Sequence, residues 1–188
     1  MRVGIVGSGH IGGTLGDLLG KAGHEVLLGS RGEAGSVAAA VAHGDAVIFA
    51  GYFSGWPDFA QEHGEALAGK VVIDAANPVA KRDGAPAEEV ARAGDGAGSH
   101  VQRLLPRSHV AKAFNTLYWE ELRDRPGTGV ALPISGEGQA AEVASALVRD
   151  VGFEPVVIGP LSRSARQDPD GPVYNKALTT AEVREALA

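Results

Sequence analysis

The sequence predicts an α/β fold, a doubly wound parallel sheet with helices on both faces. Apolar, β-branched runs alternate along the chain with runs rich in alanine and leucine, and this alternation indicates a parallel sheet covered by helices. The first apolar run leads directly into a glycine-rich turn and then into a helical run. The chain has 188 residues, of which 44% are hydrophobic and 21% charged, so it is long enough to bury a core.

The first two thirds of the chain contain five predicted strands, and a helical run follows each of the first four. The strand at 46–50 has no polar residue, so we expect both its faces to be covered. The strands are expected at residues 2–6, 25–28, 46–50, 71–75 and 109–114. The helices are expected at 11–22, ending at Gly23, and at 34–43, 57–68 and 86–93.

The last third repeats the alternation and ends in a polar segment. Strands are expected at 129–134 and 154–158, with helices at 138–150 and 180–187. The pairs Ser99/Gln102 and Thr179/Glu182 have the spacing of a capping box; the first predicts a further helix start, and the second the start of the helix at 180–187. Residues 162–178 are rich in turn residues and are expected to form an ordered or partly mobile arm. We therefore expect a single domain over 1–188, with its core at 1–161 and a C-terminal arm and helix at 162–188.

The glycine-rich turn has the spacing G-x-G-x-x-G, with its glycines at Gly7, Gly9 and Gly12. Its position between a strand and a helix makes it a dinucleotide-binding fingerprint of the Rossmann type. Gly7 would permit the tight turn, Gly9 would let a pyrophosphate approach the backbone, and Gly12 would let the helix pack closely. His10 and Ile11 lie between them, at a helix N-terminus whose free N–H groups favour phosphate.

The residues at the end of the second strand indicate whether NAD or NADP is bound. Enzymes that use NAD place an acidic residue here to bind the ribose 2′-hydroxyl. This chain has Ser30 and Arg31 instead, and no acidic residue occurs before Glu33. Arg31 can form charge-assisted hydrogen bonds with a 2′-phosphate, and Ser30 can donate to it. The sequence therefore predicts NADP(H).

Two further polar pairs follow strands at the edge where open α/β sheets bind ligands. Asn77 and Pro78 follow the strand at 71–75, and Asn115 and Thr116 follow the strand at 109–114. Their side chains could hold the nicotinamide amide or the substrate, although Asn-Pro is also an ordinary turn signal. Lys112 lies inside a strand that should be buried, and its ammonium could reach a carbonyl or a ligand beyond the sheet.

The composition excludes several kinds of chemistry. The chain has no cysteine, so thiol nucleophiles and cysteine-ligated metals are ruled out. Its six histidines show no metal-ligand spacing, and its formal net charge of −6 argues against a nucleic-acid surface. No signal peptide or membrane span is predicted, so we expect a cytoplasmic protein. No acid–base pair stands out, which suits direct hydride transfer and leaves the catalytic residues unassigned.

Over residues 1–161, the sequence resembles the F-420-dependent NADP oxidoreductase family in its short bacterial form. The resemblance rests on the fingerprint, G-S-R, N-P, K-A-F-N-T and the late G-P-L. It implies hydride transfer between NADP(H) and the deazaflavin coenzyme F-420, and a homodimer. It also implies that Gly7, Gly9, His10, Ile11 and Gly12 line the pyrophosphate, that Ser30 and Arg31 hold the 2′-phosphate, and that Asn77, Pro78, Asn115 and Thr116 surround the nicotinamide.

The chain departs from the family pattern in two places. Residues 32–44 are too few for the usual third strand and its flanking helices, so we expect that edge strand to be missing. The tail at 162–188 has no counterpart in the family pattern. Two alternatives stay open, namely an NADPH-dependent reductase of a small ketone, imine or flavin, and a non-catalytic NADP(H)-binding regulatory module.

Overall fold

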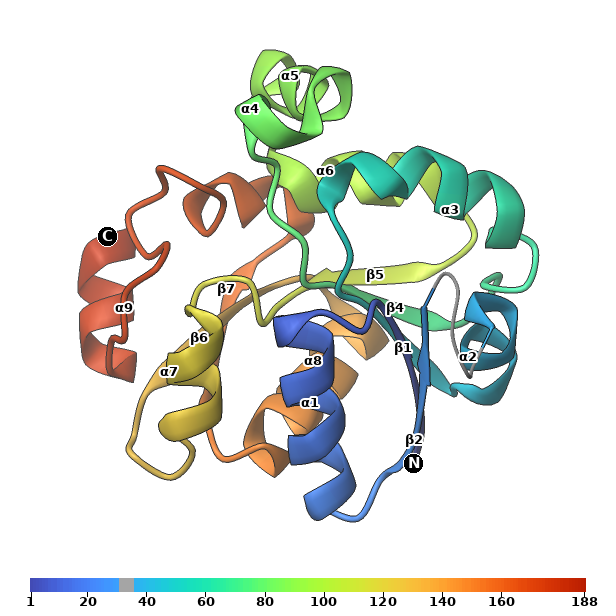
Figure 1. Cartoon of the computed structure of the whole chain (residues 1–188). Helices are drawn as coiled ribbons and strands as arrows, with labels where there is room; N and C mark the ends of the chain where they lie inside the picture. Colours follow the sequence, from blue (N-terminus) through green and yellow to red (C-terminus); the bar gives the residue numbers. More distant parts are fainter. Residues whose placement is uncertain (31–35) are drawn as a thin grey trace.

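The structure, a computed structural model, describes residues 1–30 and 36–188. At its centre is a seven-stranded sheet in the order β2-β1-β3-β4-β5-β6-β7 (Figure 1). This α/β arrangement confirms the Rossmann-type fold predicted from the sequence. The strands are β1 (Arg2–Val6), β2 (Glu25–Gly29), β3 (Ala46–Phe49), β4 (Val71–Asp74), β5 (His109–Lys112), β6 (Ala131–Ser135) and β7 (Glu154–Gly159).

Helices cover both faces of this sheet. On one face, α1 (His10–Lys21), α7 (Trp119–Asp124) and α8 (Gly138–Asp150) bury apolar side chains in one core cluster. On the other face, α2 (Val37–His43), α3 (Trp56–His63) and α6 (Gly96–Leu104) bury theirs in a second cluster. In Figure 1, α3 and α6 lie above the strands, α2 lies to the right of β1 and β2, and α1, α7 and α8 lie below. The remaining helical segments are η1 (Phe53–Gly55), α4 (Ala80–Asp83), α5 (Ala85–Ala93), η2 (Leu161–Arg166) and α9 (Thr180–Leu187).

The sheet lacks, among the described residues, the strand that lies beyond β2 in a full Rossmann sheet. After β2, the chain forms α2 and returns directly to β3, which pairs with β1. Ser36 begins α2 as its N-cap, with its Oγ accepting a hydrogen bond of 3.0 Å from the amide of Ala39. In the part of the chain that the structure describes, β2 is therefore the edge strand, as the short 32–44 segment predicts.

The last two strands depart from the expected all-parallel sheet. Strands β1 to β5 are parallel. However, β6 joins β5 antiparallel, through a pair of Lys112 and Ser135. Strand β7 then pairs parallel to β6. The sequence could not show this reversal because strand direction depends on how the segment at 113–130 crosses the sheet, not on local periodicity.

Several local predictions also need correction. Ser99 does not start a helix, since it lies inside α6, which begins after Asp95. The side chain of Gln102 instead donates to the carbonyls of Leu105 and Ser108 beyond the end of α6. The helix expected at 57–68 ends at His63. The capping box of Thr179 and Glu182 is confirmed, with both reciprocal bonds present.

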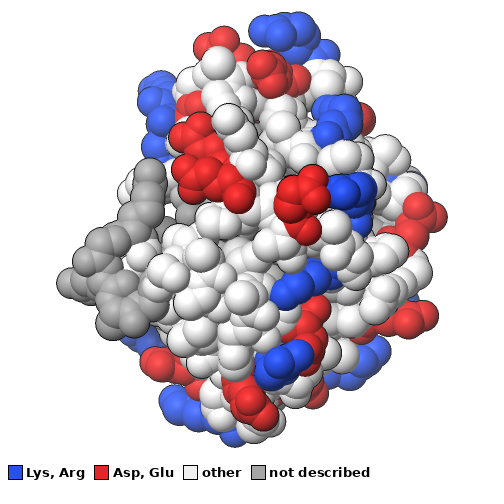
Figure 2. Space-filling view, turned by 90° about the vertical axis from the view of Figure 1, so that its right-hand side faces the viewer, with Lys and Arg blue, Asp and Glu red and all other residues white. Residues whose placement is uncertain are grey.

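The surface that carries β2 and α2 has charges of both signs. Lysine and arginine side chains are interspersed there with aspartate and glutamate, and uncharged surface lies between them (Figure 2). None of the described helices is both long and apolar enough to cross a bilayer. Within residues 1–30 and 36–188, no group of three histidine or acidic side chains is placed to hold a metal ion.

Helix α2 packs closely on β1. A Cβ atom added at Gly4 would lie 2.0 Å from the carbonyl oxygen of Ala40, a distance that requires the backbone to move. In contrast, a Cβ atom added at Gly20, on the exposed side of α1, would meet no atom within 4 Å. Gly4 is therefore required by helix packing and Gly20 is not.

We expect Gly4→Ala to lower the free energy of unfolding by about 3 kcal/mol or more, because α2 must shift away from the sheet. Gly20→Ala is the matched control, and it should raise the free energy of unfolding by roughly 0.5–1 kcal/mol, since alanine is the better helix former. Urea unfolding followed by circular dichroism measures both effects. Equal stabilities of the two variants would contradict this account of the packing.

Candidate functional site

The site predicted from the sequence lies at the carboxyl edge of the parallel strands. Strands β1, β3, β4 and β5 run side by side in one direction, so the loops that follow them meet at one edge. These loops carry the glycine-rich turn after β1, Tyr52 after β3, Asn77 and Pro78 after β4, and Asn115 and Thr116 after β5. The structure thus brings the glycine-rich turn and the two predicted polar pairs to the same end of the sheet, together with Tyr52.

The glycine-rich turn has a backbone that side chains would obstruct. Gly7 has a positive φ of 112°, and a Cβ atom there would lie 2.7 Å from the carbonyl oxygen of Ala50. A Cβ atom at Gly12 would lie 1.8 Å from the carbonyl oxygen of Gly7. These geometries agree with the turn and close packing expected of the two glycines. A Cβ atom at Gly9 would meet nothing within 4 Å, so the space above this residue is open.

The N-terminus of α1 is uncapped beneath that open space. Gly9 is the N-cap and supplies no side-chain hydrogen bond, and the first turn contains no acidic residue. The first amides of a helix have no partner within the helix, and they carry a partial positive charge. An uncapped helix start beside an open glycine is the arrangement that accepts a phosphate group.

Three residues near this turn have different surroundings. Ile11 is half-buried and packs against the first core cluster. The ring of His10 stacks on Trp119, which the sequence gave no reason to expect. Ser30 follows β2 and is half-buried, whereas Arg31, predicted to hold a 2′-phosphate, lies outside the described residues.

Asn77 and Asn115 bind each other. The Asn115 amide donates to Oδ1 of Asn77 at 2.9 Å, and the Asn77 amide donates to the main-chain carbonyl of Asn115 at 3.0 Å. Gln167, from the C-terminal arm, donates to Oδ1 of Asn115 at 2.8 Å, and the carbonyl of Gln167 accepts from the Asn115 amide at 2.7 Å. Asn115 is therefore held in place on both sides.

Burial divides the four residues predicted around the nicotinamide into two pairs. Asn115 and Thr116 are buried, with 3% and 1% of their surface exposed. Asn77 and Pro78 are half-buried. Asn77 and Pro78 can therefore contact a ligand from the surface, while Asn115 orients Asn77 from behind. Phe114, just before this pair, has a positive φ of 65°, the kind of backbone strain that persists where packing fixes the conformation.

A buried ionic cluster lies next to the amide pair. The ammonium of Lys112 lies 2.9 Å from Asp74, donates to the carbonyl of Ala76 at 2.6 Å, and lies 3.5 Å from Asp168. Trp56 and the amide of Ala76 donate to the other oxygen of Asp74, at 3.0 and 2.9 Å. Lys112 thus reaches a carbonyl, one of the two partners anticipated from its place in the strand.

The charges in this cluster shift each other's protonation. Burial alone would lower the pKa of Lys112, but attraction to Asp74 and Asp168 outweighs burial and raises that pKa. Burial raises the pKa of Asp168, and attraction to Lys112 only partly opposes this effect. The ammonium is therefore held in its charged form by the two carboxylates that face it.

The C-terminal arm is part of this cluster, which the sequence did not reveal. Asp168 also accepts a hydrogen bond of 2.7 Å from the amide of Ala97, and Ser164 accepts one of 2.9 Å from Gly98. These two side chains cap the start of α6. Asp74 could have been anticipated because it is level with Lys112 on the neighbouring strand, but nothing local identified Ser164, Gln167 or Asp168.

Two exposed tyrosines flank the same edge of the sheet. Tyr52 and Tyr118 have 65% and 56% of their surface exposed. The guanidinium of Arg82 lies over the ring of Tyr52, 4.7 Å from its centre.

Arg82 also contacts the carboxylate of Asp83. Burial alone would raise the pKa of Asp83, but hydrogen bonds from Arg82 and from the amides of Val79 and Ser54 outweigh burial and lower that pKa. Arg82 is thus paired with the neighbouring Asp83 at 2.8 Å.

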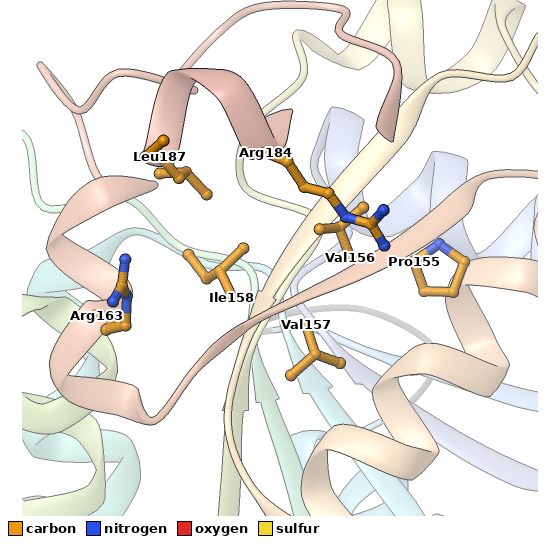
Figure 3. Close-up of a pocket in the computed structure, with 8 residues that line it drawn as sticks. Pro155, Val156, Val157, Ile158, Arg163, Arg184 and Leu187 are labelled. Atoms are coloured by element: carbon orange, nitrogen blue, oxygen red, sulfur yellow. The ribbon is translucent and has the colours of Figure 1, made fainter. Parts of the chain in front are cut away.

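A hollow of about 430 Å³ lies elsewhere, on the outer edge of β7. Figure 3 shows Arg163 and Arg184 on opposite sides of Val156 and Ile158. Among the residues that the structure describes, none of those predicted to bind the cofactor lines this hollow. The carboxyl edge, where the glycine loop and the asparagine pair lie, therefore remains the site that the chemistry of the residues supports.

Comparisons with known proteins support the fold and the resemblance. No family model matches the chain. A solved structure from Arthrobacter sp. FB24, provisionally assigned as an F420-dependent NADP reductase, is 26% identical with a TM-score of 0.74, covering 88% of this chain and 87% of its own. A protein of unassigned function from Sinorhizobium meliloti is 25% identical with a TM-score of 0.79, covering 96% of both chains. This likeness confirms the resemblance predicted from the sequence.

One curated protein is also similar. Metalloreductase STEAP3 from Rattus norvegicus is 29% identical, and the match covers 88% of this chain. The match covers 35% of the relative, so this chain spans about a third of the length of that protein.

We expect Lys112→Met to lower the free energy of unfolding by roughly 3–5 kcal/mol, because it leaves Asp74 buried without its counter-charge. Adding Asp74→Asn should recover part of the loss, since the asparagine oxygen can still accept from Trp56 and Ala76. Chemical denaturation measures all three proteins. A double variant no more stable than Lys112→Met would show that the uncompensated charge is not the cause.

The burial of His100, on α6, predicts that the folded protein becomes less stable in acid. It is buried, and its Nε2 has no hydrogen-bond partner within the described chain. Burial lowers the pKa of His100 below its ordinary value of 6.5; the charged groups that act on it are Glu89, Arg103, Asp95 and Asp74.

The folded protein therefore binds a proton at His100 less tightly than the unfolded chain does. The free energy of unfolding should consequently fall as the pH falls below about 6.5, by up to about 1.4 kcal/mol per pH unit from this group. His100→Leu should reduce that pH dependence, measured by urea unfolding at pH 7 and pH 5. An unchanged dependence in the variant would assign the acid sensitivity to other groups.

Proposed function

We propose that this protein binds NADP(H) at the carboxyl edge of its sheet and acts as an NADP(H)-dependent oxidoreductase. The observation that carries the proposal is the uncapped start of α1 beneath the open space at Gly9. A pyrophosphate there would receive hydrogen bonds from backbone amides and interact favourably with the helix dipole. The likeness to a provisionally assigned NADP reductase supports the same function.

The rest of the cofactor would extend to both sides of the glycine loop. Ser30 and Arg31, at the end of β2, would hold the 2′-phosphate of the adenosine half. Because no further strand lies beyond β2 at the sheet edge among the described residues, we expect the pocket for that half to be more open. In the other direction, Asn77 and Pro78 would contact the nicotinamide, with Asn77 held by Asn115 at 2.9 Å.

We further propose that the hydride acceptor or donor is a deazaflavin of the F-420 type. When bound, NADPH would supply a hydride to the deazaflavin, with a proton from solvent completing its reduction, and no protein group would need to form a covalent bond. The task of the protein is then to hold the two rings in contact and to keep the carboxamide end of the nicotinamide fixed. The hydrogen-bonded asparagine pair is suited to that role, because Asn115 is buried and holds Asn77, which is half-buried and can reach a ligand.

A second candidate is a reductase of a small ketone or imine. Such a reaction needs a proton donor near the nicotinamide. Tyr118 favours this candidate because it is exposed and lies shortly after Asn115 and Thr116 on the same segment. In this case the hydroxyl of Tyr118 would donate the proton as the hydride reaches the carbon. Tyr118→Phe separates the candidates, since only the second should lose activity with the hydroxyl.

The cofactor and the co-substrate are tested by one absorbance assay. Purified protein and NADPH are mixed with oxidised F-420, and the visible band of the deazaflavin is followed. We expect bleaching that requires both protein and NADPH, and much slower bleaching with NADH. Binding of NADPH without bleaching would retain the cofactor and reject the deazaflavin, and the acceptor would then be sought among small carbonyl and imine compounds.

Cofactor choice is tested by Arg31→Ala. Loss of its charge-assisted bonds should weaken NADPH binding by about ten- to hundredfold and leave NADH binding nearly unchanged. Arg107→Ala is the control, because Arg107 is exposed, pairs with Glu65 and precedes β5 at the opposite edge. An equal loss of affinity for both cofactors would contradict the role of Arg31.

A further inference from the structure

An aromatic stack joins the glycine loop to the helix that follows the asparagine pair. The rings of His10 and Trp119 lie 4.4 Å apart between centres and 16° from parallel. The guanidinium of Arg123 lies over the same tryptophan, 5.0 Å from the ring centre. Asp124 holds that guanidinium through two hydrogen bonds of 2.6 Å. Trp119 is thus held by partners on α1 and on its own helix.

The stack connects the two parts of the proposed cofactor site. His10 is the first residue of α1, immediately after Gly9, and Trp119 is the first residue of α7. Helix α7 lies beside α1 (Figure 1), and its Leu122 is fully buried in the core cluster that contains Leu15 of α1. Asn115 precedes Trp119 on the same segment. The contact therefore ties the phosphate end of the site to its nicotinamide end.

We propose that His10 and Trp119 are positioning residues that fix the start of α1 in the conformation that binds pyrophosphate. This inference rests on the proposed binding of NADP(H). A loop with glycines at Gly7 and Gly9 loses much conformational freedom when it becomes ordered, and a Cβ atom at Gly9 would find no neighbour within 4 Å. A contact that orders the loop in advance removes that cost from binding.

We assign the role of His10 to its ring contact with Trp119 and not to a charge on its imidazole. One face of the His10 ring is covered by Trp119, and the stack directs the ring toward α7. His10 would then contribute through its backbone amide, which lies in the first turn of α1. An aromatic ring without charge should serve equally well at this position.

Binding measurements on two variants test this directly. His10→Ala removes the stack and should weaken NADPH binding by about two- to tenfold, the range expected for one aromatic pair. His10→Phe keeps the stack without the imidazole and should restore binding close to the wild-type value. His109→Ala is the matched control, since His109 is exposed and begins β5 at the opposite edge. Calorimetry gives each dissociation constant, and thermal unfolding shows that each variant is folded.

The outcomes decide whether His10 acts by stacking on Trp119 or by binding phosphate through its imidazole. Wild-type affinity in His10→Ala would overturn the proposal. Equal weakening in His10→Ala and His10→Phe would also overturn it, because the imidazole itself would then be the phosphate ligand. Failure of the wild-type protein to bind NADPH would instead reject the proposed function.

Tryptophan fluorescence gives a second measurement that needs no cofactor. The chain has two tryptophans; Trp56 is fully buried, whereas Trp119 is half-buried. In the free protein, His10→Ala should increase quenching of Trp119 by acrylamide, while His10→Phe should not. Trp119→Phe identifies which signal belongs to that residue. Unchanged quenching in His10→Ala would show that the stack does not hold Trp119, and would overturn the proposal independently of NADPH.

Discussion

The burial of Lys112 is the constraint on which the carboxyl edge of this sheet depends. An ammonium removed from water is costly unless opposite charges and hydrogen bonds surround it. Here the compensation comes from Asp74 on the neighbouring strand, from the carbonyl of Ala76, and from Asp168 in the C-terminal arm. Because one of these partners belongs to the arm, the arm must pack against the sheet for the charge to be tolerated.

The arm also determines which parts of the site are fixed. Gln167 is fully buried, donates to Asn115, and accepts a hydrogen bond of 2.7 Å from Ser135 on β6. The asparagine pair is therefore held by a network whose members are satisfied before any ligand arrives. The glycine loop is different, because its helix start is uncapped and open. The carboxyl edge thus combines a hydrogen-bonded, buried part around Asn115 with a helix start whose first amides have no side-chain cap.

Much of this arrangement could be predicted from local sequence, and the exceptions have a common cause. The strands and the glycine loop follow from hydrophobic periodicity and from spacing, which depend on neighbouring residues. The stacking of His10 on Trp119 and the contacts of Gln167 and Asp168 join segments far apart in the chain. Such contacts depend on tertiary placement, which periodicity does not determine. Ser99 illustrates a different error: Ser99 and Gln102 have the spacing of a capping box, but the helix begins earlier, at Gly96, so Ser99 lies inside it.

The reversal of β6 and β7 explains how the arm reaches the buried lysine. Ser135, the last residue of β6, pairs with Lys112, the last residue of β5, and Gly159 at the end of β7 is level with Ser135. The chain therefore leaves the sheet next to Lys112, and η2 begins at Leu161, two residues later. One short helical segment then brings Gln167 and Asp168 to the end of β5. The unpredicted strand direction and the unpredicted role of the arm are thus parts of one arrangement, in which the position of β6 and β7 brings Asp168 to Lys112, in addition to Asp74 on β4.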